Sequence, residues 1–516
     1  MGGPANLRLA ELIGTLSLAT DLGLGLEQEH MLRQCRIAML LGEEIDAPAE
    51  VRGSAYYIGL LAWVGCTADS HELATGFGDD ISLRRDTYET ELAGTKALAY
   101  MLKKAGSDRS LLGRTGRRIT VLATRGSEMR DALASHCAIA STLAQRLGLG
   151  PDVSEPLRDV FERWDGRGQP SGLKRDAIPL AVRLVQIADI AEVHHHQGGL
   201  ELARAVIRDR SGGQFDPELA AAFDRSAERI FGQLDDELTW EQVLDSEPTP
   251  WQFLSGSELD AGLEAFADFV DLKSPWFIGH SRRFSQMVEA AGRQAGLPDD
   301  EVLDLRRAAL LHDIGRIGVP NSTWDRPGEL SPAERERVRL SPYLTERVLA
   351  HSEGLSGLAR LASCHQERVD GSGYPRGRDG SSLSPAERLF AAADSYTAMR
   401  ESRPYREALT PEQASEQLRK EVAAGRLSGD AVEHVLEAAG HQPLSARNRP
   451  RVAGLTAREM EVLLLIARGA TSRDVSEQLV ISEKTARNHT ERIYSKLEIN
   501  SRAELALFAM RQGLVT

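Results

Sequence analysis

The chain has 516 residues and a formal net charge of −14 at pH 7, with 41% hydrophobic and 27% charged residues. A chain of this length is expected to hold about three domains of roughly 150 residues each. The composition is that of a globular protein, and the acidic balance argues against a protein that coats nucleic acid or membranes along its whole length.

The cysteine pattern and the hydropathy of the chain indicate where in the cell the protein is expected to be. The four cysteines show no CxxC spacing, so neither a disulfide framework nor a zinc ribbon is predicted. No apolar run approaches the roughly 18 residues that span a bilayer. The first residues also lack the charged start and apolar centre of a signal peptide. We therefore expect a cytoplasmic protein that does not bind membranes.

The first half of the chain is predicted to form helix after helix with short breaks at Gly or Pro. Its sequence also resembles the second half. The matched blocks are residues 16–30 with 266–280, 60–65 with 310–315, and 162–170 with 367–375. The first two pairs lie 250 residues apart and the third lies 205 apart. Matched blocks in the same order indicate a tandem duplication, the alternative being an unrelated helical domain with chance matches.

The first copy, assigned to residues 1–244, has lost chemically important side chains. Where the second copy has His312 and Asp313, the first has an alanine and Trp63, which supply no metal ligand. His30 and Asp189, which match His280 and Asp394, are then left without their partners. We interpret this copy as a degenerate domain kept for packing, dimerisation or ligand sensing. Residues 245–251 (DSEPTPW) form the predicted first linker.

The second copy contains the segment ALLHDIGRIGVP at residues 309–320. Val302, Leu305, Ala309 and His312 fall at helical spacing, so the histidine shares an apolar stripe and should point inward with Asp313. A buried carboxylate is costly unless it is neutralised. Asp313 is therefore expected to face a cation, either a side chain or a metal ion.

Together with the downstream DGSGYP at residues 370–375, this segment resembles the HD-GYP branch of the HD superfamily, which comprises helical metal-dependent phosphohydrolases best known for hydrolysing cyclic di-GMP. The resemblance covers residues 256–442. It implies an all-α domain with the metal ligands His280, His312, Asp313, His365 and Asp394. It assigns catalytic roles to Asp313 and Arg316, and it implies a substrate-binding set of Arg316, Gly373, Tyr374 and Pro375.

The expected ligands have a clear chemical purpose. Imidazoles with carboxylates suit Fe, Mn or Zn, and a divalent ion activates water and neutralises phosphate charge. A single histidine on an apolar face is more often a core residue, so the prediction depends on the whole set. Arg316 stands where the family usually has lysine, and it could clamp a phosphate oxygen. Ser341 and Gln366 replace two family histidines that help hold further ions, so we expect one ion.

Three activities remain open for this domain. It could hydrolyse cyclic di-GMP, it could bind a nucleotide or metal as a catalytically weak sensor, or it could act on a different phosphomonoester or nucleotide. The loss of the two histidines favours the sensor.

The tail follows a Pro- and Arg-containing linker at residues 443–452 and is assigned to residues 453–516. From residue 454 it carries nine Lys/Arg against eight Asp/Glu, so nucleic-acid contacts are expected here rather than in the acidic remainder. Four short helices are predicted. The third, beginning after the cap Ser482, has an outward face suited to the major groove. That face consists of Lys484, Thr485, Arg487, Asn488, Arg492 and Lys496.

A solvated bundle with incidental charge is the alternative for this tail. However, residues 454–463, 481–489 and 493–497 closely resemble the LuxR-type helix-turn-helix domain over its full length. The resemblance implies binding to double-stranded DNA as a homodimer through the last helix, at residues 502–512.

The sequence thus predicts an all-α DNA-binding transcription regulator whose HD-GYP-type domain senses or processes a cyclic dinucleotide, another nucleotide or a metal signal. The alternative is an active metal-dependent cyclic di-GMP phosphodiesterase that its DNA-binding tail regulates or localises.

Overall fold

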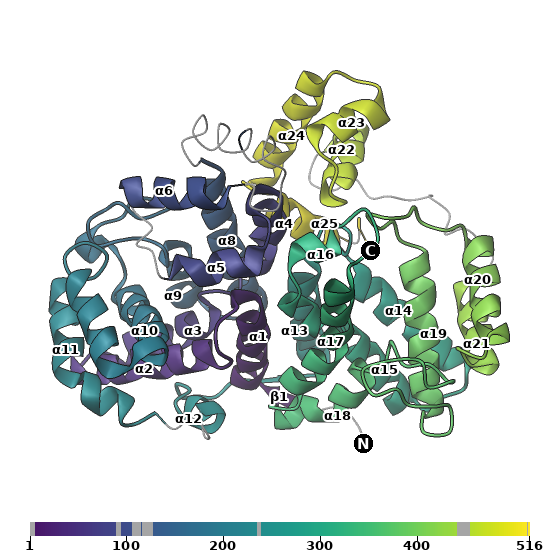
Figure 1. Ribbon diagram of the computed structural model, residues 1–516, viewed down its shortest axis with the longest axis horizontal. Coiled ribbons are helices and arrows are strands. Elements are labelled where there is room, and N and C mark those ends of the chain that lie inside the picture. Colours follow the sequence, from purple (N-terminus) through teal and green to yellow (C-terminus); the bar gives the residue numbers. More distant parts are fainter. Residues whose placement is uncertain are drawn as a thin grey trace. The chain divides into compact units, whose positions relative to one another are not determined.

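The structure, a computed structural model, describes residues 6–88, 94–105, 115, 127–234, 239–440, 455–512 and 514–515. These residues are mostly helical, which confirms the expected all-α fold (Figure 1). They form two compact units. The first unit comprises Asn6–Gly262 with Pro320–Ser322, and the second comprises Leu263–Val319 and Thr323–Thr516. The predicted linker at residues 443–452 lies outside the described residues, and the domain boundaries given above stay predictions.

The first unit is built around α2, which packs against α3 on one side and α10 on the other, while α1 contacts α2 to α5. Its helices are α1 (Leu9–Leu24), α2 (His30–Glu44), α3 (Ala49–Leu61), α4 (Cys66–Phe77), α5 (Asp80–Thr87), α6 (Gly94–Lys104), α8 (Ser127–Arg146), α9 (Pro151–Ser154), α10 (Leu180–Asp209), α11 (Pro217–Phe231) and α12 (Thr239–Asp245). Two 3₁₀ turns, Pro156–Asp159 and Arg175–Ala177, lie between α9 and α10.

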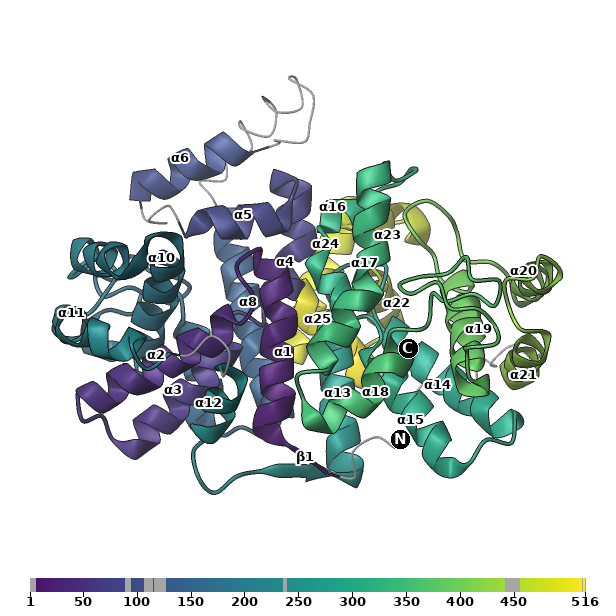
Figure 2. The same ribbon diagram turned by 60° about the horizontal axis from the view of Figure 1, so that its bottom comes forward.

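A short β-ribbon was not expected from the sequence. Strand β1 (Asn6–Arg8) pairs antiparallel with β2 (Phe253–Ser255), with Asn6 opposite Ser255, and β1 leads directly into α1 (Figure 2). Three-residue strands are too short to show an alternating pattern, which explains why they escape a periodicity argument. The ribbon ties the start of the first unit to the segment that precedes α13 (Gly256–Asp271).

The second unit is centred on α14, which packs against α15, α19 and α21. Its elements are α14 (His280–Gln294), α15 (Asp299–Leu311), the 3₁₀ turn η3 (Ile314–Gly318), α17 (Pro332–Leu349), α18 (Glu353–Ala362), α19 (Pro385–Met399), α20 (Pro411–Ala423) and α21 (Gly429–Ala439). Helix α16 (Asn321–Trp324) lies across the division between the units. Ser331 and Ser384 form capping boxes with Glu334 and Glu387 and fix the starts of α17 and α19.

The tail forms the four predicted helices: α22 (Ala457–Ala467), α23 (Ser472–Leu479), α24 (Glu483–Leu497) and α25 (Arg502–Arg511). Thr456 caps α22 with Glu459, and Ser482 caps α24 by accepting from the Thr485 N–H at 3.0 Å. Between α23 and α24, Val480 has φ +52°, so a β-branched residue adopts the left-handed conformation that the turn requires.

Candidate metal centre and DNA-binding helix

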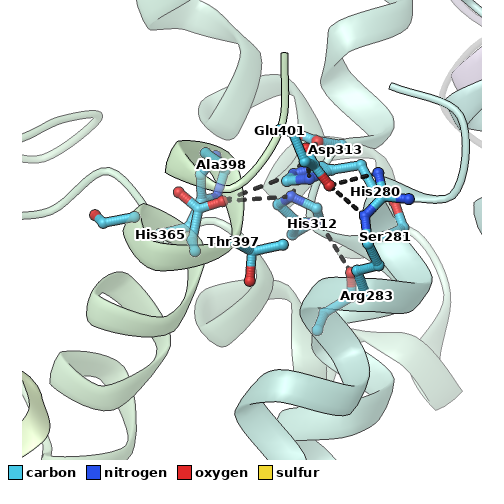
Figure 3. A network of polar contacts seen from close by, with 12 residues as sticks. His280, Ser281, Arg283, His312, Asp313, His365, Thr397, Ala398 and Glu401 are labelled. Atoms are coloured by element: carbon cyan, nitrogen blue, oxygen red, sulfur yellow. Dashed lines mark hydrogen bonds and ion pairs between the residues drawn. The ribbon is translucent and has the colours of Figure 1, made fainter. Parts of the chain in front are cut away.

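Three of the five predicted ligands come together in the second unit, whereas Asp313 and His365 lie outside this cluster. His280 opens α14, His312 follows the last residue of α15, and Asp394 lies in α19; all three are buried. The ring nitrogens Nε2 of His280 and His312 lie 3.8 and 3.9 Å from Oδ1 of Asp394. Figure 3 shows the two imidazoles beside Asp313. One ligand atom from each residue lies within 4.8 Å of the other two, a spacing at which one ion could touch all three.

Two of the imidazoles are fixed through their other nitrogen. The Nδ1 atoms of His312 and His365 lie 2.8 and 3.1 Å from backbone carbonyl oxygens. Because these oxygens can only accept, Nδ1 carries the proton in both rings and the Nε2 lone pair is left for another partner. Histidines that bind metals are oriented in this way. The Nδ1 atom of His280 lies 2.9 Å from the carboxylate of Glu401 without a hydrogen bond.

The geometry fits a divalent ion. His312 Nε2 is buried and makes no hydrogen bond, although the carboxylate of Asp313 lies 2.9 Å away. Burial lowers the pKa of His280 and of His365 to about 4, which favours the neutral rings that metal ligands require. Burial also lowers the pKa of His312, but Asp313 and Asp394 outweigh it and raise that pKa above its usual value. A set of imidazoles and carboxylates suits Fe, Mn or Zn.

Asp313 faces a side-chain cation, one of the two alternatives that the sequence left open. Its Oδ2 lies 2.5 Å from the Arg316 guanidinium. Burial would raise the pKa of Asp313, but Arg316 and His312 outweigh it and hold that pKa well below its usual range. Arg316 is itself buried, with its guanidinium 3.6 Å from the centre of the Phe277 ring. Its role as a phosphate clamp stays a prediction, because in this structure it neutralises Asp313.

Gln366 and Ser341, which stand where the family usually has histidines, form hydrogen bonds within the protein. The amide of Gln366 donates to Oδ2 of Asp394 at 3.2 Å, and the hydroxyl of Ser341 donates to the carbonyl of Val338 at 2.8 Å. Gln366 therefore donates to Oδ2 of Asp394, whereas the Nε2 contacts of His280 and His312 involve Oδ1. This contact supports the expectation of one ion.

The loop that carries Gly373, Tyr374 and Pro375 is held by one buried carboxylate. Glu367 accepts the backbone N–H groups of Arg376 and Arg378, each at 2.8 Å. A Cβ atom on Gly373 would lie 2.4 Å from the backbone nitrogen of Arg368, so only glycine fits there. Tyr374 is half-buried. Whether these loop residues touch a substrate stays a prediction.

The first unit contains a loop that is built in the same way as the loop around Gly373. Glu162 matches Glu367 and accepts the backbone N–H groups of Ser171 and Gly172 at 2.6 and 2.9 Å. A Cβ atom on Gly168 would meet the backbone nitrogen of Arg163 at 2.4 Å, the same clash as in the second unit. The loops of the two copies therefore share their construction, which supports the duplication.

His30 and Asp189 are not stranded, contrary to our expectation. One oxygen of Asp189, Oδ1, lies 3.0 Å from His30 Nε2 and accepts from the Trp63 indole N–H and the Tyr88 hydroxyl, each at 3.1 Å. The other nitrogen of His30 bonds to Glu192. Tyr88 lies outside the matched blocks, so the sequence comparison could not identify it as a partner.

Glu401 is the main site residue that sequence reasoning missed. Besides His280 it contacts Arg283 at 2.5 Å and Arg403 at 2.7 Å. These charges outweigh burial and hold its pKa far below the usual range. It lies seven residues, or about two helical turns, after Asp394, and that spacing is the one signal that could have placed it beside the site.

The predicted DNA-binding face lies on α24. Lys484, Arg487, Asn488, Arg492 and Lys496 are exposed, whereas Thr485 is half-buried. Two of the charges are partly engaged: Arg487 pairs with Glu483 at 2.6 Å, and Lys496 pairs with Glu459 of the α22 capping box at 2.6 Å. Lys496 thus joins α24 to α22, while Lys484 and Arg492 present their charge to solvent. Contact of these residues with DNA stays a prediction.

Comparisons with known proteins agree with this organisation. Residues 264–429 match the HD domain family, and residues 453–509 match the LuxR family of bacterial regulatory proteins. A relative from Vibrio cholerae, 3′3′-cGAMP-specific phosphodiesterase 3, is 30% identical over 79% of this chain and 89% of its own length. The cyclic di-GMP phosphodiesterase response regulator RpfG of Xanthomonas campestris is 36% identical over 26% of this chain and 35% of its own.

A solved structure also resembles the chain. The crystal structure of a cyclic GMP-AMP-specific phosphodiesterase from V. cholerae superposes with a TM-score of 0.60 at 27% identity, covering 85% of this chain and 99% of that one. Within the described residues, every helix is too short or too polar to cross a membrane. The chain is therefore a member of the HD-GYP branch of the HD-domain family, joined to a C-terminal DNA-binding domain of the LuxR family.

Proposed function

We propose that this protein is a DNA-binding transcription regulator whose second unit binds a cyclic dinucleotide at a single-metal HD-GYP site and thereby changes DNA binding by the tail. It would act in the cytoplasm as a homodimer, with α25 as the contact between subunits. One observation carries the proposal. The Nε2 atoms of the buried His280 and His312 lie 3.8 and 3.9 Å from Asp394, in a chain that also contains a LuxR-type domain.

The proposed ligands are His280, His312 and Asp394, with His365 and Asp313 beside them. His365 lies with its ring centre 5.0 Å from that of His312, so it could complete the coordination of one ion. The bound ion would supply a Lewis acid that neutralises phosphate charge and activates water. The chain's own residues fix the imidazoles, exclude water by burial and keep Arg316 beside Asp313.

The hydrogen bond from Gln366 to Asp394 is the reason why we favour ligand sensing over efficient hydrolysis. A second ion would need a carboxylate oxygen near the first, yet Asp394 Oδ2 already accepts from the Gln366 amide. Phosphodiesters are commonly hydrolysed by two ions that stabilise both the attacking and the leaving oxygen. A site with one ion can bind the phosphate without cleaving it efficiently.

An active phosphodiesterase is the second candidate. Two observations favour it: the atoms of His280, His312 and Asp394 lie within 4.8 Å of one another, and relatives of this chain carry the names of cyclic di-GMP and cGAMP phosphodiesterases. In that case the tail would localise or regulate the enzyme.

Turnover separates the two candidates. Purified full-length protein would be incubated with 3′3′-cGAMP and, separately, cyclic di-GMP in the presence of Mn²⁺ or Fe²⁺, and the products separated by chromatography. Asp313→Ala provides the control, because it removes a proposed ligand and leaves Arg316 unpaired. Product from the wild type alone would establish the enzyme. Binding of either nucleotide without product would support the sensor, and the absence of both binding and product would refute the proposal.

DNA binding is tested on α24. Lys484→Ala is expected to weaken DNA binding at every sequence and to lower the slope of log K against log salt by about 1, the loss of one phosphate contact. Lys420→Ala, which removes an exposed lysine of the second unit outside the tail, is the matched control and should change neither quantity. An unchanged slope in Lys484→Ala would remove this residue from the interface.

A further inference from the structure

The first unit contains a cavity where the second unit has its candidate metal centre. Its volume is about 190 Å³, and its wall includes Ala62, Trp63 and Asp189. At the two offsets these residues match His312, Asp313 and Asp394. The duplicated framework has thus kept a hollow at the old site while changing the side chains around it.

The residues at this hollow do not favour a metal ion. In the second unit the imidazole of His280 turns a lone pair towards Asp394. In the first, Asp189 already receives the indole N–H of Trp63 and the hydroxyl of Tyr88, and His30 lies 3.0 Å away. These donors take the place of a cation beside the carboxylate. A ligand of the first unit must therefore be recognised by other means.

The cavity wall is aromatic. The ring centre of Trp63 lies 5.2 Å from that of Phe161 and 5.6 Å from that of Tyr88, and His136 lies 4.9 Å from Phe161. All four rings line the cavity. Aromatic walls of this kind favour a flat ring system, such as a nucleobase, which stacks against or between them.

Arginines supply positive charge at the same cavity. Arg163, Arg167 and Arg210 line it, together with the buried Arg84 and the carboxylates of Asp69, Glu162 and Asp189. Arg84 pairs with Asp69 and Asp80, and Arg163 pairs with Asp165 at 3.2 Å, so both are engaged within the protein. Arg210 donates to the Gln214 side-chain oxygen and the Tyr88 backbone oxygen, at 3.3 Å each. Arg167 is exposed, and its backbone N–H donates to Asp165 at 3.0 Å. A planar guanidinium matches the geometry of a phosphate group.

The lining limits the ligand. The cavity has a volume of about 190 Å³, and its wall holds one group of aromatic rings, Trp63, Tyr88, Phe161 and His136. That group provides for one nucleobase, whereas a cyclic dinucleotide carries two. We propose that the first unit binds one nucleoside monophosphate without cleaving it. The base would lie among Trp63, Tyr88 and Phe161, and the phosphate would meet Arg167 at the mouth.

Calorimetric titration of the full-length chain with GMP and with AMP tests this site. The titrations would use an Asp313→Ala background with a chelator, so that the result does not depend on whether the second unit binds metal or has activity. We expect one site per chain for at least one of the two nucleotides. Arg167→Ala, an exposed change that leaves the fold alone, should weaken binding at least tenfold.

Two further variants make the test specific. Ala62→Leu fills the cavity and should abolish binding without any change of charge, with folding checked by its thermal transition. Arg225→Ala removes an exposed arginine on α11 away from the cavity and should leave the affinity within twofold. Three results would overturn the proposal: no binding of either nucleotide at millimolar concentration, binding that survives both Arg167→Ala and Ala62→Leu, or equally tight Arg167-dependent binding of a cyclic dinucleotide.

Discussion

Asp189 on α10 and Asp394 on α19 occupy matching positions in the two copies, and their surroundings differ in one decisive respect. In the first unit the carboxylate pairs with His30 and accepts from the Trp63 indole and the Tyr88 hydroxyl. In the second it faces the ring nitrogens of His280 and His312 across gaps of 3.8 and 3.9 Å. One framework thus supports a hydrogen-bonded carboxylate beside a cavity in one copy and a set of candidate ligand atoms in the other.

The comparison shows how the two copies satisfy a buried carboxylate differently. Trp63 stands where the second copy has Asp313, and its indole N–H hydrogen-bonds to Asp189. The buried charge of Asp189 would otherwise be costly.

The largest expected effect is on metal content. Asp394→Ala should reduce bound Fe, Mn or Zn from one ion per chain to nearly none, since it removes the carboxylate that His280 and His312 share. Asp189→Ala is the matched change in the other copy and should leave the metal content unaltered. Elemental analysis of the purified proteins measures both. Equal loss in the two variants would break the distinction between the copies.

Glu401 contacts His280 in the second unit, and Glu192 contacts His30 in the first. We expect substitutions of these two carboxylates to have different effects. Glu401→Gln weakens the orientation of His280 and is expected to lower metal affinity about 10- to 100-fold, as changes behind metal ligands do. Glu192→Gln removes one partner of a buried charged pair with His30 and Arg33. It should lower the free energy of unfolding by about 3–5 kcal/mol without changing metal content. Metal titration and denaturant unfolding separate these outcomes.

The pH dependence of stability sharpens the same comparison. Burial lowers the pKa of His30, but Glu192 and Asp189 outweigh it and raise that pKa from 6.5 to about 10. Burial likewise raises the pKa of Glu192, but His30 and Arg33 lower it overall from 4.5 to about 2. The stabilisation from His30 is therefore complete below pH 6.5 and is lost as pH rises towards 10. That from Glu192 is complete above pH 4.5 and is lost as pH falls towards 2.

Calorimetric melting of the full-length chain between pH 6.5 and 10 tests this assignment. The wild-type transition of the first unit should fall towards the temperature of His30→Gln, which lacks the titrating ring. Parallel curves for the two proteins over this range would show that His30 does not carry the charge assigned to it.

The smallest expected effect lies in the tail. Val480 is 90% exposed and has φ +52°, a conformation that favours glycine. Val480→Gly should therefore stabilise the tail by about 1 kcal/mol, because it relieves the backbone strain of a β-branched residue. Gln478→Gly, on the preceding helix, should instead destabilise it by about 1 kcal/mol. Thermal unfolding of the two variants should show shifts of opposite sign in the melting temperature. Shifts of the same sign would refute the proposed backbone strain at Val480.

Much of the architecture could be predicted from local sequence signals. The capping boxes at Ser331, Ser384 and Thr456 give helix starts directly, because the cap and the Glu three residues later satisfy each other's backbone groups. The offsets of 250 and 205 exposed the duplication. The HD and LuxR motifs placed His280, His312, Asp394 and the outward face of α24.

What the sequence did not predict depends on contacts between distant segments. The β-ribbon joins residues about 250 positions apart and has no periodic signal in either strand. The partners of Asp189 include Tyr88, which no motif contains. Arg316 was expected to meet a phosphate, yet it is buried on Asp313 and Phe277, because spacing alone does not reveal which neighbour a long side chain selects.

The most direct test of the proposed regulator is the affinity of the full-length chain for DNA with and without nucleotide. Genomic fragments selected by the protein would supply the operator, and fluorescence anisotropy would give Kd in the presence and absence of 3′3′-cGAMP or cyclic di-GMP. The account predicts at least a tenfold shift in Kd for the wild type and none for Asp394→Ala. An unchanged Kd in the wild type, measured while the nucleotide is being bound or hydrolysed, would contradict it and leave an enzyme whose tail only localises it.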